Sequence, residues 1–234
     1  MESNLERGFM VNIKICGITA VREALWLNEA DVDYAGFVFY PKSKRGISIQ
    51  RATEIAKKLN PKIKRVAVTV SPERGQIEEL TETGFDIVQA HGKWDDFDAG
   101  KIRIPVWRAV NIANLEELMK ELQRYIAMEH APQAVVLDAG SFGSGKTFGW
   151  EQNAPAWRTE EYQRLRKGLR ERKIRLALAG GLDFGNVKKG IELFEPDIVD
   201  VSTGVEADTP VFTGKSREKI EAFCRVCRNG GEDE

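Results

Sequence analysis

Residues 135–147 read VVLDAGSFGSGKT, an apolar run followed by a loop that satisfies the phosphate-loop pattern G-x-x-x-x-G-K-[ST] from Gly140 to Thr147. Taken alone, this stretch predicts a nucleotide triphosphatase, in which such a loop leads directly into a helix and holds phosphate groups. The residues that follow argue against this interpretation, because Gly149 and Pro155 make a poor helix start. The fold therefore depends on what surrounds the stretch.

The run VVLD is one of a series of short apolar runs rich in β-branched residues. Their length is that of buried strands, and they cover residues 11–16, 34–39, 65–70, 86–90, 105–109, 134–138, 175–179 and 197–202. Longer stretches with helical spacing separate them. Eight such units predict a single parallel α/β (β/α)8 TIM barrel, a fold of typically ~250 residues, with an open doubly wound sheet as the alternative.

The predicted domain organisation has one folded unit. We expect residues 1–10 to be a flexible N-terminal leader, residues 11–228 to form the barrel catalytic domain, and residues 229–234 to be a disordered tail. The longest gap between predicted strands, residues 139–174, is expected to hold an exposed loop and a helix.

Helix starts can be predicted from capping residues, which bond the unpaired amides of a first turn. Ser48 precedes one amphipathic stretch, and Asn114 and Asn186 precede two others. Ser71 is predicted as a further N-cap, with Pro72 at the first helical position.

Composition excludes several classes of protein. The net charge is −1, with 42% apolar and 30% charged residues, which is typical of a soluble globular protein without a field that attracts nucleic acid or membrane. No apolar run is long enough to span a bilayer and the N-terminus is too polar for a signal peptide, so we expect a cytoplasmic location. Cys224 and Cys227 form a lone C-x-x-C in a helical pattern, which predicts neither a disulfide framework nor a metal site.

Cys16 ends the first predicted strand, where a barrel collects its chemistry. A lone cysteine is more often a small buried residue than a catalyst. Lys14 shares its strand face, and an ammonium group there would favour the thiolate by lowering the thiol pKa. A buried lysine needs an anionic partner, for which Asp200 is a candidate.

Other polar residues lie at the same predicted end of the barrel. Asp138 ends the sixth strand and is either a helix cap, a partner for a basic residue, or an acid with a raised pKa. His91 follows the fourth strand and is either structural or a donor to a substrate oxygen. Arg45 follows the second strand, where it is either exposed to solvent or a bidentate hydrogen-bond donor to a carboxylate. Glycine-bearing loops at 180–181 and 202–204 follow strands seven and eight, where such barrels often hold phosphate.

Seven stretches occur together in a single order, between residue 12 and about residue 223: KICGIT, GFVFYPKSKR, DIVQAHG, VVLDA, GSGKTFGW, LALAGGL and DVSTGVE. In this combination the chain resembles the phosphoribosylanthranilate isomerase family of tryptophan biosynthesis. Within that family the GSGKTF stretch is a family feature and not a nucleotide site. A nucleotide-binding protein that uses residues 140–147, or another phosphosugar isomerase barrel, remains the alternative.

The resemblance implies an Amadori rearrangement of N-(5-phosphoribosyl)anthranilate to 1-(2-carboxyphenylamino)-1-deoxyribulose 5-phosphate, with no cofactor or metal. It implies a small phosphorylated substrate as the partner, no nucleic acid or membrane, and a monomer or homodimer. Asp138 matches the family's general acid, Cys16 its general base, and Arg45 the residue that binds the anthranilate carboxylate. The loops at Gly181 and at Ser202, Thr203 and Gly204 match the family's phosphate site. His91 and Asp200 are the other residues expected to bind the substrate.

Departures from the family pattern are also visible. Ser216 stands where an aspartate is usual, and we expect it to cap the last helix instead. Residues 150–174 and the segment 207–214 are longer than expected, and the second of these could reshape the phosphate site.

Overall fold

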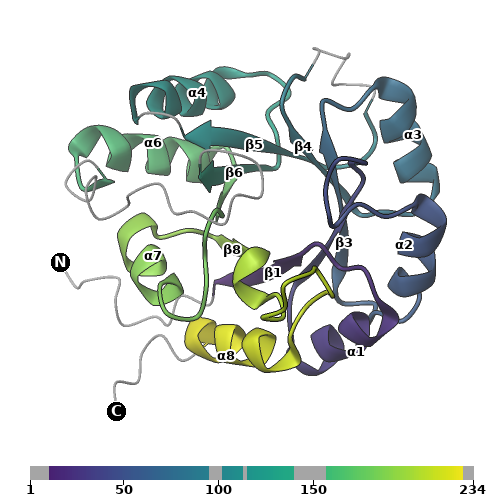
Figure 1. Ribbon diagram of the computed structural model, residues 1–234. Helices are drawn as coiled ribbons and strands as arrows, with labels where there is room; N and C mark the ends of the chain where they lie inside the picture. Colours follow the sequence, from purple (N-terminus) through teal and green to yellow (C-terminus); the bar gives the residue numbers. More distant parts are fainter. Residues whose placement is uncertain (1–10, 95–101, 113–114, 140–156, 229–234) are drawn as a thin grey trace.

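The computed structural model describes residues 11–94, 102–112, 115–139 and 157–228, which form a closed barrel of parallel strands surrounded by helices (Figure 1). The strands are β1 (Asn12–Cys16), β2 (Tyr34–Val38), β3 (Lys64–Val70), β4 (Ile87–His91), β5 (Val106–Ile112), β6 (Ala134–Ala139), β7 (Arg175–Leu178) and β8 (Ile198–Val201). Parallel pairing of β1 with β8 closes the ring. The predicted (β/α)8 barrel is thus confirmed, and the open doubly wound sheet is excluded.

The helices lie outside the ring of strands. They are α1 (Val21–Glu29), α2 (Ile49–Ala56), α3 (Arg74–Glu82), α4 (Leu115–Ala127), α6 (Glu160–Glu171), α7 (Val187–Phe194) and α8 (Arg217–Arg228), with a 3-10 turn, η3 (Thr203–Val205), after β8. The predicted strands match the observed ones to within one residue at either end, except that β5 continues to Ile112. A helix, α6, lies in the long gap after β6, as predicted.

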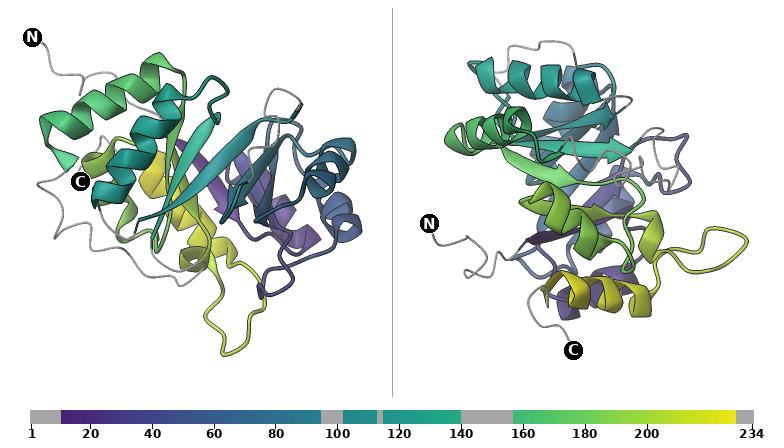
Figure 2. Two further views of the ribbon diagram at one scale, coloured as in Figure 1. Left: turned by 90° about the horizontal axis from the view of Figure 1, so that it is seen from above. Right: turned by 90° about the vertical axis from the view of Figure 1, so that its left-hand side faces the viewer.

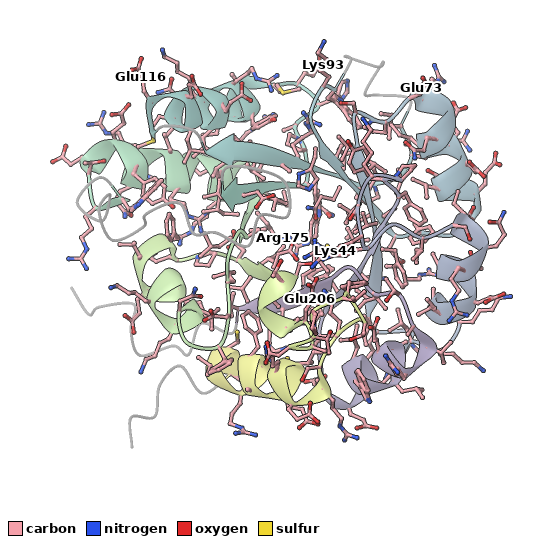
Figure 3. All side chains as sticks on the ribbon, in the orientation of Figure 1. Lys44, Glu73, Lys93, Glu116, Arg175 and Glu206 are labelled. Atoms are coloured by element: carbon pink, nitrogen blue, oxygen red, sulfur yellow. The ribbon has the colours of Figure 1, made fainter. Side chains whose placement is uncertain are left out.

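Alternation along the strands divides the core into two layers. Outward-facing residues such as Ile13 and Val199 are fully buried between the barrel and the helices. Inward-facing residues fill the barrel, and its N-terminal end holds Tyr34 and Trp107, whose ring centroids lie 5.0 Å apart. Arg175 Nη1 donates to the Tyr34 hydroxyl at 2.7 Å near the barrel axis (Figure 3). These packed side chains close the N-terminal end of the barrel, and the polar side chains lie at the C-terminal ends of the strands.

The predicted start of α3 is wrong. The helix begins at Arg74 with Glu73 as its N-cap, so neither Ser71 nor Pro72 has the predicted place. Ser71 instead adopts a left-handed backbone, with φ 46°, and its hydroxyl accepts the amide of Lys93 at 3.0 Å. A bond between the loops after β3 and β4 therefore takes the hydroxyl that a local cap would have used.

The other capping predictions have mixed outcomes. Ser48 accepts the Arg51 amide at 3.2 Å and caps α2, and Ser216 accepts the Lys219 amide at 3.3 Å at the start of α8. Asn186 stands at the N-cap position of α7, but its side chain makes no capping bond there.

Several predictions fall on residues outside the described part of the chain: Asn114, the leader 1–10, the tail 229–234 and the phosphate-loop pattern 140–147. Cys224 and Cys227 are free thiols buried on α8, and burial raises the pKa of each to about 12. Within the described ranges, no group of His, Cys, Asp and Glu residues is arranged to hold a metal ion. None of the described helices is both long enough and apolar enough to cross a membrane.

Candidate active site

A cavity of about 310 Å³ opens at the C-terminal ends of the strands. All the predicted site residues except Gly204 line it, namely Cys16, Arg45, His91, Asp138, Gly181, Asp200, Ser202 and Thr203. They come from six of the strands or the loops that follow them. The fold therefore brings together, around one cavity, candidate site residues that lie far apart in the sequence.

Gly204 lies behind the cavity wall. A Cβ atom at this position would lie 2.0 Å from the carbonyl oxygen of Leu182 and 2.9 Å from the Cα atom of Asp183. Glycine is thus needed for the η3 turn to pack against the loop after β7. A contact of Gly204 with a phosphate stays a prediction.

Cys16 lies beside Lys14 in a space that Gly36 leaves open. Cys16 and Gly36 are paired across β1 and β2. A Cβ atom on Gly36 would lie 2.9 Å from Cys16 Sγ and 3.2 Å from Lys14 Nζ. The thiol and the ammonium group are therefore neighbours around one small residue.

Lys14 and Asp200 form a buried ion pair, with 2.7 Å between Nζ and Oδ2. The two residues are in register on β1 and β8 and both face inward. Burial alone would lower the Lys14 pKa, but the carboxylate of Asp200 and the thiol of Cys16 outweigh it and raise the pKa. Asp200, which the sequence suggested as the anionic partner of Lys14, is thus its partner in the structure.

The pKa of Cys16 is raised, contrary to the expectation from its neighbour. Burial is the main cause, because the thiolate loses its hydration, and the Asp200 charge acts in the same direction. Lys14 and Lys215 oppose the rise without reversing it. The expected lowering is therefore wrong because the sequence does not reveal how completely the thiol is buried.

Gln89 and His91 are neighbours on the inner face of β4. Burial, together with the charges of Lys14 and Arg108, lowers the His91 pKa to about 3, so the imidazole is neutral at physiological pH. Gln89 Nε2 lies 3.0 Å from His91 Nε2 and donates to it. The proton of the ring is then on Nδ1, which lies 3.9 Å from Asp138 Oδ2.

Arg45 is buried at the mouth of the cavity and held in place. Its Nε donates to Glu206 Oε1 at 2.5 Å and its Nη2 to Thr203 Oγ1 at 2.7 Å. Lys44 Nζ bonds the second Glu206 oxygen at 2.8 Å, and Figure 3 shows these two side chains close together. Burial would raise the Glu206 pKa, but the bonds from Lys44 and Arg45 and the charge of Lys215 hold it below its ordinary value.

Lys215 connects the loop after β8 to the base of the site. Its Nζ donates to the Ser202 carbonyl oxygen at 3.0 Å, and the Ser202 hydroxyl donates to the Cys16 carbonyl oxygen at 3.0 Å. Its backbone amide donates to Glu23 Oε1 at 2.8 Å. Burial lowers the Lys215 pKa to about 8. A network over such sequence separations has no local signature, so sequence reasoning missed Lys215, Glu23 and Glu206.

The loop after β7 reaches the cavity through Gly180 and Gly181, which have φ values of 81° and 67°. Asn186 Nδ2 donates to the Gly181 carbonyl oxygen at 2.9 Å. Asn186 therefore supports this loop instead of capping α7.

The segment 207–214 projects beyond the strand ends, next to the loop after β2 (Figure 2). Glu206 and Lys215 are bridged in antiparallel fashion at its base. The Phe212 ring centroid lies 5.3 Å from Lys44 Nζ. The segment thus contacts the cavity mouth beside Arg45.

Comparison with known proteins adds to this geometry. The family model described as N-(5'phosphoribosyl)anthranilate (PRA) isomerase matches residues 13–225. The N-(5'-phosphoribosyl)anthranilate isomerase of Aquifex aeolicus is 38% identical over 204 residues, covering 85% of this chain and 91% of the relative.

Solved structures of phosphoribosyl anthranilate isomerases are also similar to this chain. The crystal structure of phosphoribosyl anthranilate isomerase from Thermotoga maritima superposes with a TM-score of 0.75 at 36% identity, covering 94% of this chain and 99% of that one. A phosphoribosyl anthranilate isomerase in complex with reduced 1-(o-carboxyphenylamino)-1-deoxyribulose 5-phosphate superposes with a TM-score of 0.73 at 33% identity, with the same coverage.

Proposed function

The chain belongs to the N-(5'-phosphoribosyl)anthranilate isomerase family, and from this membership we propose that it converts N-(5'-phosphoribosyl)anthranilate into 1-(2-carboxyphenylamino)-1-deoxyribulose 5-phosphate. The reaction is an aldose–ketose isomerisation of tryptophan biosynthesis. The observation that carries the proposal is that Cys16 and Asp138, from β1 and β6, line one cavity.

Asp138 acts as the general acid in this proposal. It gives a proton to the ribose ring oxygen, the bond from that oxygen to C1 breaks, and an iminium forms between C1 and the anthranilate nitrogen. His91 faces the same carboxyl group from β4. Such a proton transfer contributes ~10²–10⁴-fold to the rate.

Cys16 acts as the general base. Its thiolate takes the proton from C2, which the iminium has made acidic, and the electron pair neutralises the iminium to give an enolamine. Loss of the proton from the C2 oxygen and gain of one at C1 complete the ketone. Burial raises the pKa of the thiol, and a cationic iminium beside Sγ adds to the charge of Lys14 in favouring the thiolate.

The remaining polar residues suit the anionic ends of the substrate. Arg45 is fixed through Nε and Nη2 by Glu206 and Thr203, which makes it a preorganised partner for the anthranilate carboxylate. The positive φ values of Gly180 and Gly181 suit a loop that turns its backbone amides toward a phosphate, and Ser202 lines the same cavity.

The test is a fluorescence assay of phosphoribosylanthranilate consumption by Cys16→Ala and Asp138→Asn. We expect each change to lower kcat by roughly 10²-fold or more, with the circular dichroism spectrum unchanged. Cys227→Ala is the matched control, because this thiol lies on α8 and does not line the cavity. Near wild-type kcat in both site variants would show that the roles are wrongly assigned.

A further inference from the structure

Two buried side-chain oxygens have no hydrogen-bond partner among the described residues, Gln89 Oε1 and Asp200 Oδ1. Both residues line the cavity. Gln89 is only 2% exposed, so bulk water does not replace the missing donor. A buried acceptor without a donor carries a free-energy penalty, and native proteins keep few of them outside functional sites.

Each of the two side chains is anchored at its other polar atom. Gln89 Nε2 donates to His91, and Asp200 Oδ2 accepts from Lys14. Because β4 and β8 are four positions apart in a ring of eight strands, the two oxygens approach the cavity from opposite walls. Neither oxygen belongs to the base, the acid or the arginine to which the mechanism gives a role.

The chemistry of these oxygens selects a ligand group. An amide carbonyl is a neutral acceptor, so it suits a neutral O–H donor better than an anion. The anionic groups of the proposed substrate are matched by Arg45 and by the glycine-bearing loops, which leaves its sugar hydroxyls as the donors to be recognised.

We propose that Gln89 Oε1 accepts a hydrogen bond from a ribose hydroxyl of the substrate and thereby selects a polyhydroxylated chain. Gln89 is then a specificity residue, held in orientation by His91, with Asp200 Oδ1 as a second acceptor across the cavity. This assignment rests on the proposed function, since it names the substrate group that Gln89 recognises in the same cavity.

The experiment measures binding without turnover. The probe is reduced 1-(2-carboxyphenylamino)-1-deoxyribulose 5-phosphate together with its 2-deoxy, 3-deoxy and 4-deoxy analogues, titrated by calorimetry into the wild type and Gln89→Met. We expect the deoxy analogue that lacks the hydroxyl bound by Gln89 to bind the wild type ~10-fold more weakly than the parent, the factor for one hydrogen bond of about 1.4 kcal/mol. We expect Gln89→Met to bind the parent compound more weakly by the same factor and to lose the preference for that hydroxyl.

Gln133→Met is the matched control. The oxygen of Gln133 is already bonded to Trp107 Nε1 at 3.0 Å, and the residue does not line the cavity, so this variant keeps the wild-type preference. Tight binding of the parent to Gln89→Met with every hydroxyl preference retained overturns the assignment and leaves Gln89 as a support for His91. No binding of the parent to the wild type overturns the proposed function as well, so the two failures are distinguishable.

Discussion

At the scale of single residues, the site depends on which buried groups carry charge. Lys14 is fully buried, yet Asp200 and Cys16 keep its pKa raised, so it remains an ammonium beside a thiol whose own pKa burial raises. A thiolate in such a place depends on nearby positive charge. Of the charges that face Cys16, those of Lys14 and Lys215 favour the thiolate and that of Asp200 disfavours it.

Replacing Lys14 should therefore raise the Cys16 pKa further. We expect Lys14→Met, combined with Asp200→Asn so that no lone carboxylate stays buried, to lower kcat/KM at pH 8 roughly 10-fold or more, with partial recovery at higher pH. Asp200→Asn alone is the control. The direct measurement is the pH dependence of iodoacetamide alkylation of Cys16 in a Cys224→Ala, Cys227→Ala background. An alkylation midpoint at the same pH with and without Lys14 would contradict the expectation.

Residue positions were more predictable than residue environments. Alternation places Lys14 and Cys16 on one strand face, and the ends of parallel strands bring Asp138 and His91 together, so these positions follow from the sequence. The same rule of two-residue spacing would have found Gln89 from His91. The direction in which the Cys16 pKa shifts depends on how completely the thiol is buried, which only the packed structure reveals.

At the scale of elements, the loops after β7 and β8 act as one unit. The η3 turn approaches the Leu182 carbonyl so closely that position 204 has no room for a side chain. The β8 loop is also tied to α1 through the bond from the Lys215 amide to Glu23. The phosphate-binding geometry proposed for Ser202 and Gly181 thus depends on contacts behind the cavity wall.

Gly204→Ala should separate these two loops. The added Cβ would meet backbone atoms that cannot move independently, so we expect a loss of roughly 1–3 kcal/mol in the free energy of unfolding and a higher KM. Gly75→Ala is the control, because nothing lies within 4 Å of its Cβ position, and it should be neutral or stabilise by about 0.4–1 kcal/mol. Urea unfolding and steady-state kinetics give both quantities. Equal behaviour of the two alanine variants would show that the loops are not coupled by this contact.

Strands were predicted more accurately than helix starts, for a physical reason. Each strand is a short, mostly apolar run between the barrel interior and the helices, so its limits follow from composition. A side chain at a predicted cap position can instead bond a partner outside the helix. Ser71 accepts the amide of Lys93, which lies 22 residues later, and Asn186 donates to the carbonyl of Gly181 in the preceding loop, so neither side chain caps its helix.

At the scale of the whole molecule, the barrel keeps polar groups in its interior that weaken the fold under some conditions. His91 is buried as a neutral imidazole, with a pKa lowered from 6.5 to about 3. Between these values the unfolded chain binds a proton that the folded protein does not. Stability is therefore lost as the pH falls below about 6.5, and it is retained above this value. The site thus makes the whole barrel sensitive to acid.

The prediction is a loss of about 1.4 kcal/mol in the free energy of unfolding between pH 7.5 and pH 5.5 from this one group, before the carboxylates begin to titrate. His91→Gln should remove that part of the pH dependence in urea unfolding, because the amide gains no proton in either state. His130→Gln is the matched control, since His130 lies exposed just after α4 and should leave the dependence as in the wild type. If His91→Gln and the wild type lose stability in parallel, the acid sensitivity of the barrel has another source, and the neutral state assigned to His91 beside Asp138 loses its support.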